Sequence, residues 1–168
     1  MKRLVILCGI PGAGKSTFIK NHKNFFGATV KVISRDDIRF SLVKENEEYF
    51  SREREVWAKY IADIKNSLEI NETTIADATH LNAASRLKLI NALGRSLKNV
   101  EVIPVVLKVG YELAAAQNEN RRGTRSYVPP TTIRNMSNNF IMPSFEEYDY
   151  KAIYIYEPNK KAIIRERS

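Results

Sequence analysis

The strongest constraint on the fold is a phosphate-binding loop within the first seventeen residues. A continuous apolar run, Leu4–Cys8, is typical of a buried strand, and it leads into the pattern G-x-x-x-x-G-K-S. Glycines let the backbone bend tightly, so that successive N–H groups point at phosphate oxygens, and the following helix offers its positive end. The pattern therefore predicts nucleotide binding, with the contacts made by Gly9, Pro11, Gly12, Ala13, Gly14, Lys15, Ser16 and Thr17.

Two side chains of this loop have a defined chemistry in such sites. We expect Lys15 to reach the β- and γ-phosphates, where its charge supports catalysis, and the Ser16 hydroxyl to bind Mg²⁺. The expected cofactors are therefore ATP and Mg²⁺.

Composition limits what the remainder of the chain does. The 168 residues, 43% hydrophobic and 27% charged, are typical of one soluble domain, so we expect residues 1–168 to form a single domain. The chain holds no apolar run of the roughly 18 residues that a membrane span needs, and its single cysteine favours a reducing cytoplasm. The net charge of +8 makes nucleic acid a candidate second substrate, with solvated surface lysines as the alternative.

Apolar strand patterns alternate with helical patterns along the chain. This alternation predicts an α/β fold, in which a parallel sheet is covered by helices on both faces. Further strands are expected over 28–34, 73–77 and 100–109, the last tolerating Pro104 only near an edge or a bulge. Helices are expected over 47–68, 82–97, 111–120 and from Thr131 or Thr132 to 140, and a hairpin over 152–156 and 162–165.

Carboxylates follow two of the expected strands. The carboxyl ends of parallel strands meet at one edge of the sheet, where ligands bind. Asp77 ends the third strand and suits a Mg²⁺ ligand beside Ser16; its alternative role, as a helix cap, is one that Asn82 fills by itself. Asp36 or Asp37, after the second strand, suits a general base that takes a proton from an attacking hydroxyl, with helix capping as the alternative.

Arginines complete the expected site. Arg39 lies three residues after Asp36, so a helix presents both on one face, where Arg39 would hold a substrate phosphate beside the attacking hydroxyl. Residues 121–130 combine arginines with turn formers, which predicts a lid that closes over the transferring phosphoryl group. An exposed loop without that role is the alternative. The candidate lid arginines are Arg121, Arg122 and Arg125.

Two rings are weaker candidates for substrate contacts. His80 follows the third strand closely enough to touch substrate, although a lone histidine is more often structural. Tyr127, in the lid, is a candidate for stacking on a base.

Four motifs in this order resemble the kinase domain of bacteriophage polynucleotide 5′-kinases of the T4 type, in the P-loop kinase superfamily. They are G-I-P-G-A-G-K-S-T, S-R-D-D-I-R-F-S, I-A-D-A-T-H-L-N and N-R-R-G-T followed by V-P. The resemblance covers nearly the whole chain. It implies the nucleotide-kinase fold, with strands in the order 2-3-1-4-5.

The resemblance also implies an activity, the transfer of the γ-phosphate of ATP to a 5′-hydroxyl of DNA or RNA in nucleic-acid repair. It selects Asp36 as the base, Arg39 as the ligand of the acceptor phosphate, and Arg122 as the lid residue on the nucleotide phosphates. The phage family has asparagine where this chain has His80, so contacts there are expected to differ. The phage enzymes also carry a phosphatase domain with a D-x-D-G-T motif, which these 168 residues lack, so no 3′-phosphatase activity is expected of them.

Other acceptors and roles stay open at this point. Related P-loop kinases phosphorylate nucleosides, small alcohols, antibiotics or hydroxymethylated bases in DNA. The net charge favours a polyanionic acceptor, whereas a deep enclosed pocket would favour a small molecule. A nucleotide-gated binding module is disfavoured because it would give Asp36 and the arginine lid no task.

Overall fold

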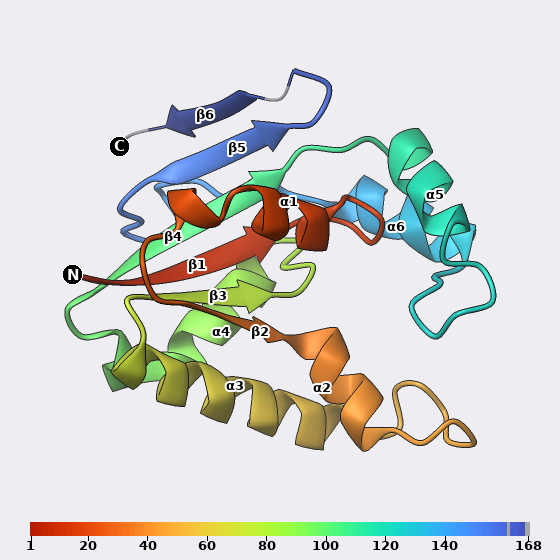
Figure 1. The fold of residues 1–168 in the computed structure, drawn as a ribbon, viewed down its shortest axis with the longest axis horizontal. Coiled ribbons are helices and arrows are strands. Elements are labelled where there is room, and N and C mark those ends of the chain that lie inside the picture. Colours follow the sequence, from red (N-terminus) through yellow and green to blue (C-terminus); the bar gives the residue numbers. More distant parts are fainter. Residues whose placement is uncertain (161, 167–168) are drawn as a thin grey trace.

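The computed structural model describes residues 1–160 and 162–166, which form a six-stranded sheet with helices on both sides (Figure 1). The spatial order is β2-β3-β1-β4-β5-β6, with the first five strands parallel and β6 antiparallel to β5. The predicted α/β class, the order 2-3-1-4-5 and the hairpin at the end are confirmed; Lys161, in the predicted hairpin turn, lies outside the described residues. The strands are β1 Lys2–Cys8, β2 Val30–Ser34, β3 Thr73–Asp77, β4 Val100–Leu107, β5 Ile153–Glu157 and β6 Ala162–Glu166.

Several helices lie near one end of the sheet. In Figure 1, α5, α6 and the far end of α2 gather at the carboxyl ends of the parallel strands. In the described part of the chain, no helix has the length and apolar character needed to cross a membrane. The helices are α1 Lys15–Asn21, α2 Arg35–Leu42, α3 Glu53–Ile70, α4 Ala83–Leu93, α5 Tyr111–Glu119 and α6 Pro130–Asn139, with short 3-10 turns η1 Lys23–Phe25 and η2 Gly94–Leu97.

Each face of the sheet has its own apolar core, because side chains alternate along a strand. Leu4 and Ile6 of β1 pack in the core that includes residues of α3 and α4. Val5 and Leu7 face the other way and pack in the core that includes residues of α1, α5 and α6. The prediction of helices on both faces is therefore confirmed.

Two helices begin elsewhere than the sequence predicts. The helix expected from residue 47 begins at Glu53, because residues 44–52 form turns in which Arg52 pairs with Glu47 (Nε to Oε2, 2.7 Å). The helix α6 has no threonine cap and begins at Pro130, whose fixed φ suits the first helical position. The lid therefore ends at Pro129.

The position of Pro104 also corrects a prediction. Strand β4 lies between β1 and β5, so Pro104 is not at a sheet edge. The Lys151 N–H donates to the Val102 carbonyl (3.0 Å), so the backbone polar groups of Val102 and Pro104 turn toward the β5 side. Pairing with β5 begins only at Val105, opposite Tyr154. The missing N–H of Pro104 falls just before this ladder starts and leaves no bond unmade.

Candidate active site

The phosphate loop joins β1 to α1, and a close contact with α5 requires glycine at one of its positions. Gly12 has φ +82°, and a Cβ there would lie 2.2 Å from the Ala114 carbonyl oxygen of α5. Only glycine allows this close approach. Lys15 Nζ lies back over the loop and donates to the carbonyls of Gly9 (3.0 Å) and Ile10 (3.3 Å). The ammonium is thus held at the loop that is expected to bind phosphate.

Asp77 stands at the end of β3, in register with Leu7 of β1 and Ser34 of β2. Burial raises the pKa of Asp77 from 3.8 to about 6, opposed by the charge of Lys15 and increased by the charge of Asp36. Burial lowers the pKa of Lys15, and the charges of Asp77 and Asp36 oppose that shift. The charges of the three groups therefore act on one another, while their joint role in catalysis stays a prediction.

Asp77 and Ser16 supply the oxygen ligands that Mg²⁺ prefers. The buried carboxylate of Asp77 would gain from a nearby cation, because its raised pKa reflects the cost of burying its charge. Among the described residues, no group of three or more His, Cys, Asp and Glu side chains is placed to hold a metal ion. Phosphate oxygens and water would have to complete the coordination, which is usual for Mg²⁺, so the two residues fit the ion.

Asp36 lies in the first turn of α2 and is tied to Arg39. Arg39 Nη1 donates to Asp36 Oδ1 (2.5 Å), and Arg39 Nε and Nη2 donate to the two carboxylate oxygens of Glu53 (2.6 and 3.0 Å). The side chain of Arg39 is 7% exposed, whereas that of Asp36 is 64% exposed and open to an acceptor. The cap of α2 is Ser34, whose Oγ accepts from the Asp37 N–H (3.2 Å), so capping is the task of neither aspartate.

This arrangement gives Arg39 a different immediate role from the predicted one. Its donors are occupied by Glu53, Asp36 and the Tyr49 hydroxyl (3.2 Å), so it orients the Asp36 carboxylate. Contact with an acceptor phosphate would require an exchange of one of these bonds. Sequence analysis missed Glu53 and Tyr49; the only available signal was their place among acidic and aromatic residues at the start of the helix expected over 47–68.

The three lid arginines have three different environments. Arg122, expected on the nucleotide phosphates, is 65% exposed and donates from Nε and Nη2 to Glu119 (2.7 and 3.0 Å). Arg125 donates to the carbonyls of Phe40 (3.2 Å) and Val43 (2.7 Å) at the end of α2. Arg121 is close enough to the phosphate loop for its charge to lower the pKa of Lys15.

These contacts revise the expected lid contacts. Arg122 and Arg125 are both engaged by protein groups, so their predicted binding to nucleotide would require release from Glu119 and from the end of α2. Figure 1 shows the lid, between α5 and α6, and the loop after α2 on the same side of the molecule, beyond the carboxyl ends of β1 and β3. The role of the lid therefore stays a prediction, and the charge of Arg121 acts on Lys15 of the phosphate loop.

His80 is a core residue, which corrects the expectation that it contacts substrate. It is 6% exposed, its Nδ1 donates to the Leu7 carbonyl (2.5 Å), and its Nε2 accepts from the Tyr60 hydroxyl (3.3 Å). Burial lowers its pKa to about 4, so the ring is neutral. With both ring nitrogens engaged, His80 fixes the loop after β3 against β1. The neighbouring Thr79 carbonyl accepts from the Gly9 N–H (3.0 Å), so this loop also holds the phosphate loop.

A buried ion pair that sequence analysis missed supports the same loop. Arg86 is fully buried and donates to the His80 carbonyl (Nη1, 2.9 Å) and to both carboxylate oxygens of Glu147 (2.7 and 3.1 Å). The Tyr150 hydroxyl donates to the same carboxylate (2.8 Å). The partners are 61 residues apart in sequence, so no local pattern indicates the pair.

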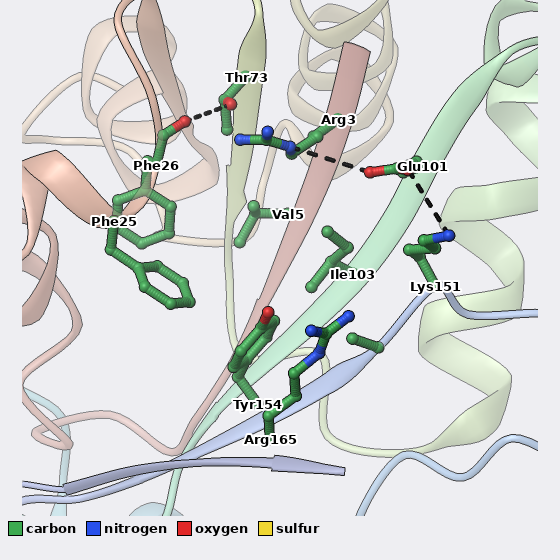
Figure 2. Close-up of a pocket in the computed structure, with 11 residues that line it drawn as sticks. Arg3, Val5, Phe25, Phe26, Thr73, Glu101, Ile103, Lys151, Tyr154 and Arg165 are labelled. Atoms are coloured by element: carbon green, nitrogen blue, oxygen red, sulfur yellow. Dashed lines mark hydrogen bonds and ion pairs between the residues drawn. The ribbon is translucent and has the colours of Figure 1, made fainter. Parts of the chain in front are cut away.

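Two of the hollows on the surface of the described residues bear on the site. One, of about 630 Å³, lies beside the first turn of α5, the helix that touches the phosphate loop, and includes Tyr111 and Arg134 in its lining. The other, of about 290 Å³, opens near the start of β1 and β4 (Figure 2), whereas the phosphate loop follows the other end of β1. Glu101 there lies near Arg3 (3.9 Å) and Lys151 (4.0 Å). None of the predicted site residues lines this second hollow.

Comparison with known proteins agrees with this geometry. Residues 4–143 match the model of the family described as AAA domain. A curated relative from Acanthamoeba polyphaga mimivirus, named "Putative bifunctional polynucleotide phosphatase/kinase", is 23% identical over 150 residues, which are 87% of this chain and 31% of the relative.

Two solved structures share the fold. A chain in the structure of the Pnkp1/Rnl/Hen1 RNA repair complex has a TM-score of 0.69 and 20% identity, over 82% of this chain and 43% of that one. Kti12 of Chaetomium thermophilum, in complex with ADP-AlF3, has a TM-score of 0.69 and 16% identity, over 93% and 89%. The chain thus spans about a third of the curated relative and less than half of the repair-complex chain. These matches support the P-loop kinase superfamily, while the phage type within it stays a prediction.

Proposed function

The chain belongs to the AAA domain family, and from that premise we propose that it is an ATP-dependent kinase of 5′-hydroxyl ends of DNA or RNA, acting in nucleic-acid repair. The observation that carries the proposal is topological: the phosphate loop follows β1 and the Asp36–Arg39 pair follows β2, and the ends of both strands are in register with Asp77 of β3. The names of the mimivirus relative and of the RNA repair complex support a polynucleotide acceptor. The net charge of +8 suits a polyanion.

The donor side of the reaction is held by the phosphate loop. Loop N–H groups and Lys15 bind the β- and γ-phosphates, and the hollow beside α5 offers room for the nucleoside. Ser16 and Asp77 would hold Mg²⁺, which when bound neutralises charge on the phosphate oxygens. Arg121 adds positive charge from the lid, where charge develops during transfer.

The acceptor side is organised by Asp36. Its exposed carboxylate takes the proton of the 5′-hydroxyl while the hydroxyl oxygen bonds to the γ-phosphorus. The bond between the γ-phosphorus and the oxygen that bridges it to the β-phosphate breaks at the same centre, and ADP leaves. Arg39 keeps the Asp36 carboxylate oriented, and Glu53 fixes Arg39 in turn.

Transfer from γ-labelled ATP with Mg²⁺ to a panel of acceptors tests the proposal. The panel contains 5′-hydroxyl DNA and RNA oligonucleotides, the same oligonucleotides with 5′-phosphate, mononucleoside 3′-phosphates and free nucleosides. We expect label on the 5′-hydroxyl ends and none on the phosphorylated controls. Label on small acceptors or internal bases alone would retain a phosphoryl-transfer site and reject the polynucleotide acceptor.

Salt dependence gives an independent test of the acceptor class. Oligonucleotide affinity should fall steeply and linearly on a logarithmic scale as salt rises, because bound phosphates release counterions. A flat response would oppose a polyanionic acceptor.

A further inference from the structure

Three aromatic side chains form a cluster on the acceptor side of the candidate site: Phe40 of α2, and Tyr49 and Phe50 of the loop that follows it. The ring centroids of Tyr49 and Phe50 are 4.7 Å apart, edge to face, and those of Phe40 and Tyr49 are 6.1 Å apart. Phe50 is 61% exposed, far more than a ring of the apolar cores. An exposed ring in a fixed setting offers a flat apolar face to a ligand.

The cluster is held by the charged groups of the site. The guanidinium of Arg39 lies 4.9 Å from the ring centroid of Tyr49 and 5.4 Å from that of Phe50. Arg39 is itself fixed by its two bonds to Glu53. The rings are therefore positioned by a buried arginine, and cation–π attraction adds to their edge-to-face contact.

The cluster also contacts Asp36, the expected general base. The Tyr49 hydroxyl donates to Asp36 Oδ1 (3.2 Å), so the aromatic cluster adjoins the carboxylate that is expected to receive the proton. Phe50 packs edge to face against Tyr49, so it continues the aromatic surface from this contact. A nucleotide whose 5′-hydroxyl reaches Asp36 would therefore extend its base toward these rings.

We infer that Tyr49 and Phe50 form a stacking platform for the base of the acceptor's 5′-terminal nucleotide, an inference that rests on the proposed function. Stacking suits an enzyme that phosphorylates ends of any base sequence, because every nucleobase has an aromatic face. Tyr127, the stacking candidate from the sequence, lies instead against Arg122 (4.9 Å) and donates to Glu119 (3.4 Å). The platform is thus on the α2 side of the site and not on the lid.

Steady-state kinetics of Phe50→Ala tests the platform. With a 5′-hydroxyl oligonucleotide, KM should rise between about fivefold and about a hundredfold, the range that base–aromatic stacking gives, while kcat changes little. Phe50→Trp should retain the wild-type KM. Phe25→Ala is the matched control, because Phe25 is also an exposed ring (37%) but lines the hollow at the other end of the sheet (Figure 2).

A second acceptor separates stacking from a structural effect. An oligonucleotide with an abasic 5′-terminal sugar should have a raised KM with the wild-type protein, and Phe50→Ala should add no further increase. An unchanged KM for Phe50→Ala on the normal acceptor, or an equal increase on both acceptors, would overturn the platform while the kinase activity stands. No transfer to any nucleic acid by the wild-type protein would reject the proposed function, and the platform with it.

Discussion

Replacing Arg86 with methionine should destabilise the protein by about 3 to 5 kcal/mol. The Arg86 guanidinium is fully buried, and the Glu147 side chain is 9% exposed. The two bonds between them (2.7 and 3.1 Å) offset most of the cost of burying the charge of Glu147. Arg86→Met leaves Glu147 with the Tyr150 hydroxyl as its recorded side-chain partner. An unpaired buried charge of this kind costs about 3 to 5 kcal/mol, which lowers Tm by roughly 6 to 20 °C in a domain of this size.

Urea unfolding of four proteins measures the effect. They are the wild type, Arg86→Met, the double variant Arg86→Met/Glu147→Gln, and Lys59→Met, which breaks the exposed Lys59–Asp63 pair (2.9 Å). The double variant should regain much of the loss, because it removes the unpaired charge, and Lys59→Met should cost less than about 1 kcal/mol. A cost for Arg86→Met no larger than that for Lys59→Met would refute the reasoning.

The same variant should weaken nucleotide binding. Arg86 holds the His80 carbonyl, and the adjacent Thr79 carbonyl accepts from the Gly9 N–H of the phosphate loop. Loss of Arg86 therefore loosens the loop, and ATP affinity measured by calorimetry below the unfolding transition should fall. Unchanged ATP affinity would show that the phosphate loop keeps its position without this support.

Three further substitutions test the site. Asp77→Asn, without metal and nucleotide, should raise the free energy of unfolding at pH 7.5 by about 2 to 3 kcal/mol. Folding raises the pKa of Asp77 from 3.8 to about 6, so the wild-type protein loses stability as pH rises through that range. The gain should vanish toward pH 4 in urea unfolding, and a gain that persists there would exclude this cause. Asp36→Asn should lower kcat about 10²- to 10⁴-fold with ATP affinity unchanged, and retained turnover would reject Asp36 as the base. Lys15→Ala should lower kcat about 10²-fold or more in single-turnover transfer, and a smaller loss would remove Lys15 from transition-state stabilisation.

The fold could be predicted because its signals are local. A strand followed by G-x-x-x-x-G-K-S, the alternation of strands and helices, and the cap Asn82 each depend on neighbouring residues, and the structure confirms them, with Ser85 completing the Asn82 capping box. The prediction for Pro104 was wrong because a proline in this strand is tolerated only where β5 does not yet pair with β4. Where that pairing begins depends on the tertiary structure and not on the local sequence.

The site was only partly predictable, for a related reason. Asp36 and Asp77 sit at strand ends, so topology alone brings them together. The roles of His80, Arg86 and Glu53 depend on partners 6 to 73 residues away, and no local pattern specifies them. The choice among lid arginines likewise depends on which of them finds a partner within the folded chain.

The bonds from Arg125 to the end of α2 have a consequence for turnover. The helix that presents Asp36 at its first turn is bonded at its last turn by Arg125 of the proposed lid. A lid movement that brings Arg125 onto the nucleotide would break these bonds and free the end of this helix, where the cation stabilises the helix dipole. Lid closure over the donor and loosening of the acceptor helix would then be one movement, so changes on the two sides of the site would occur at coupled rates.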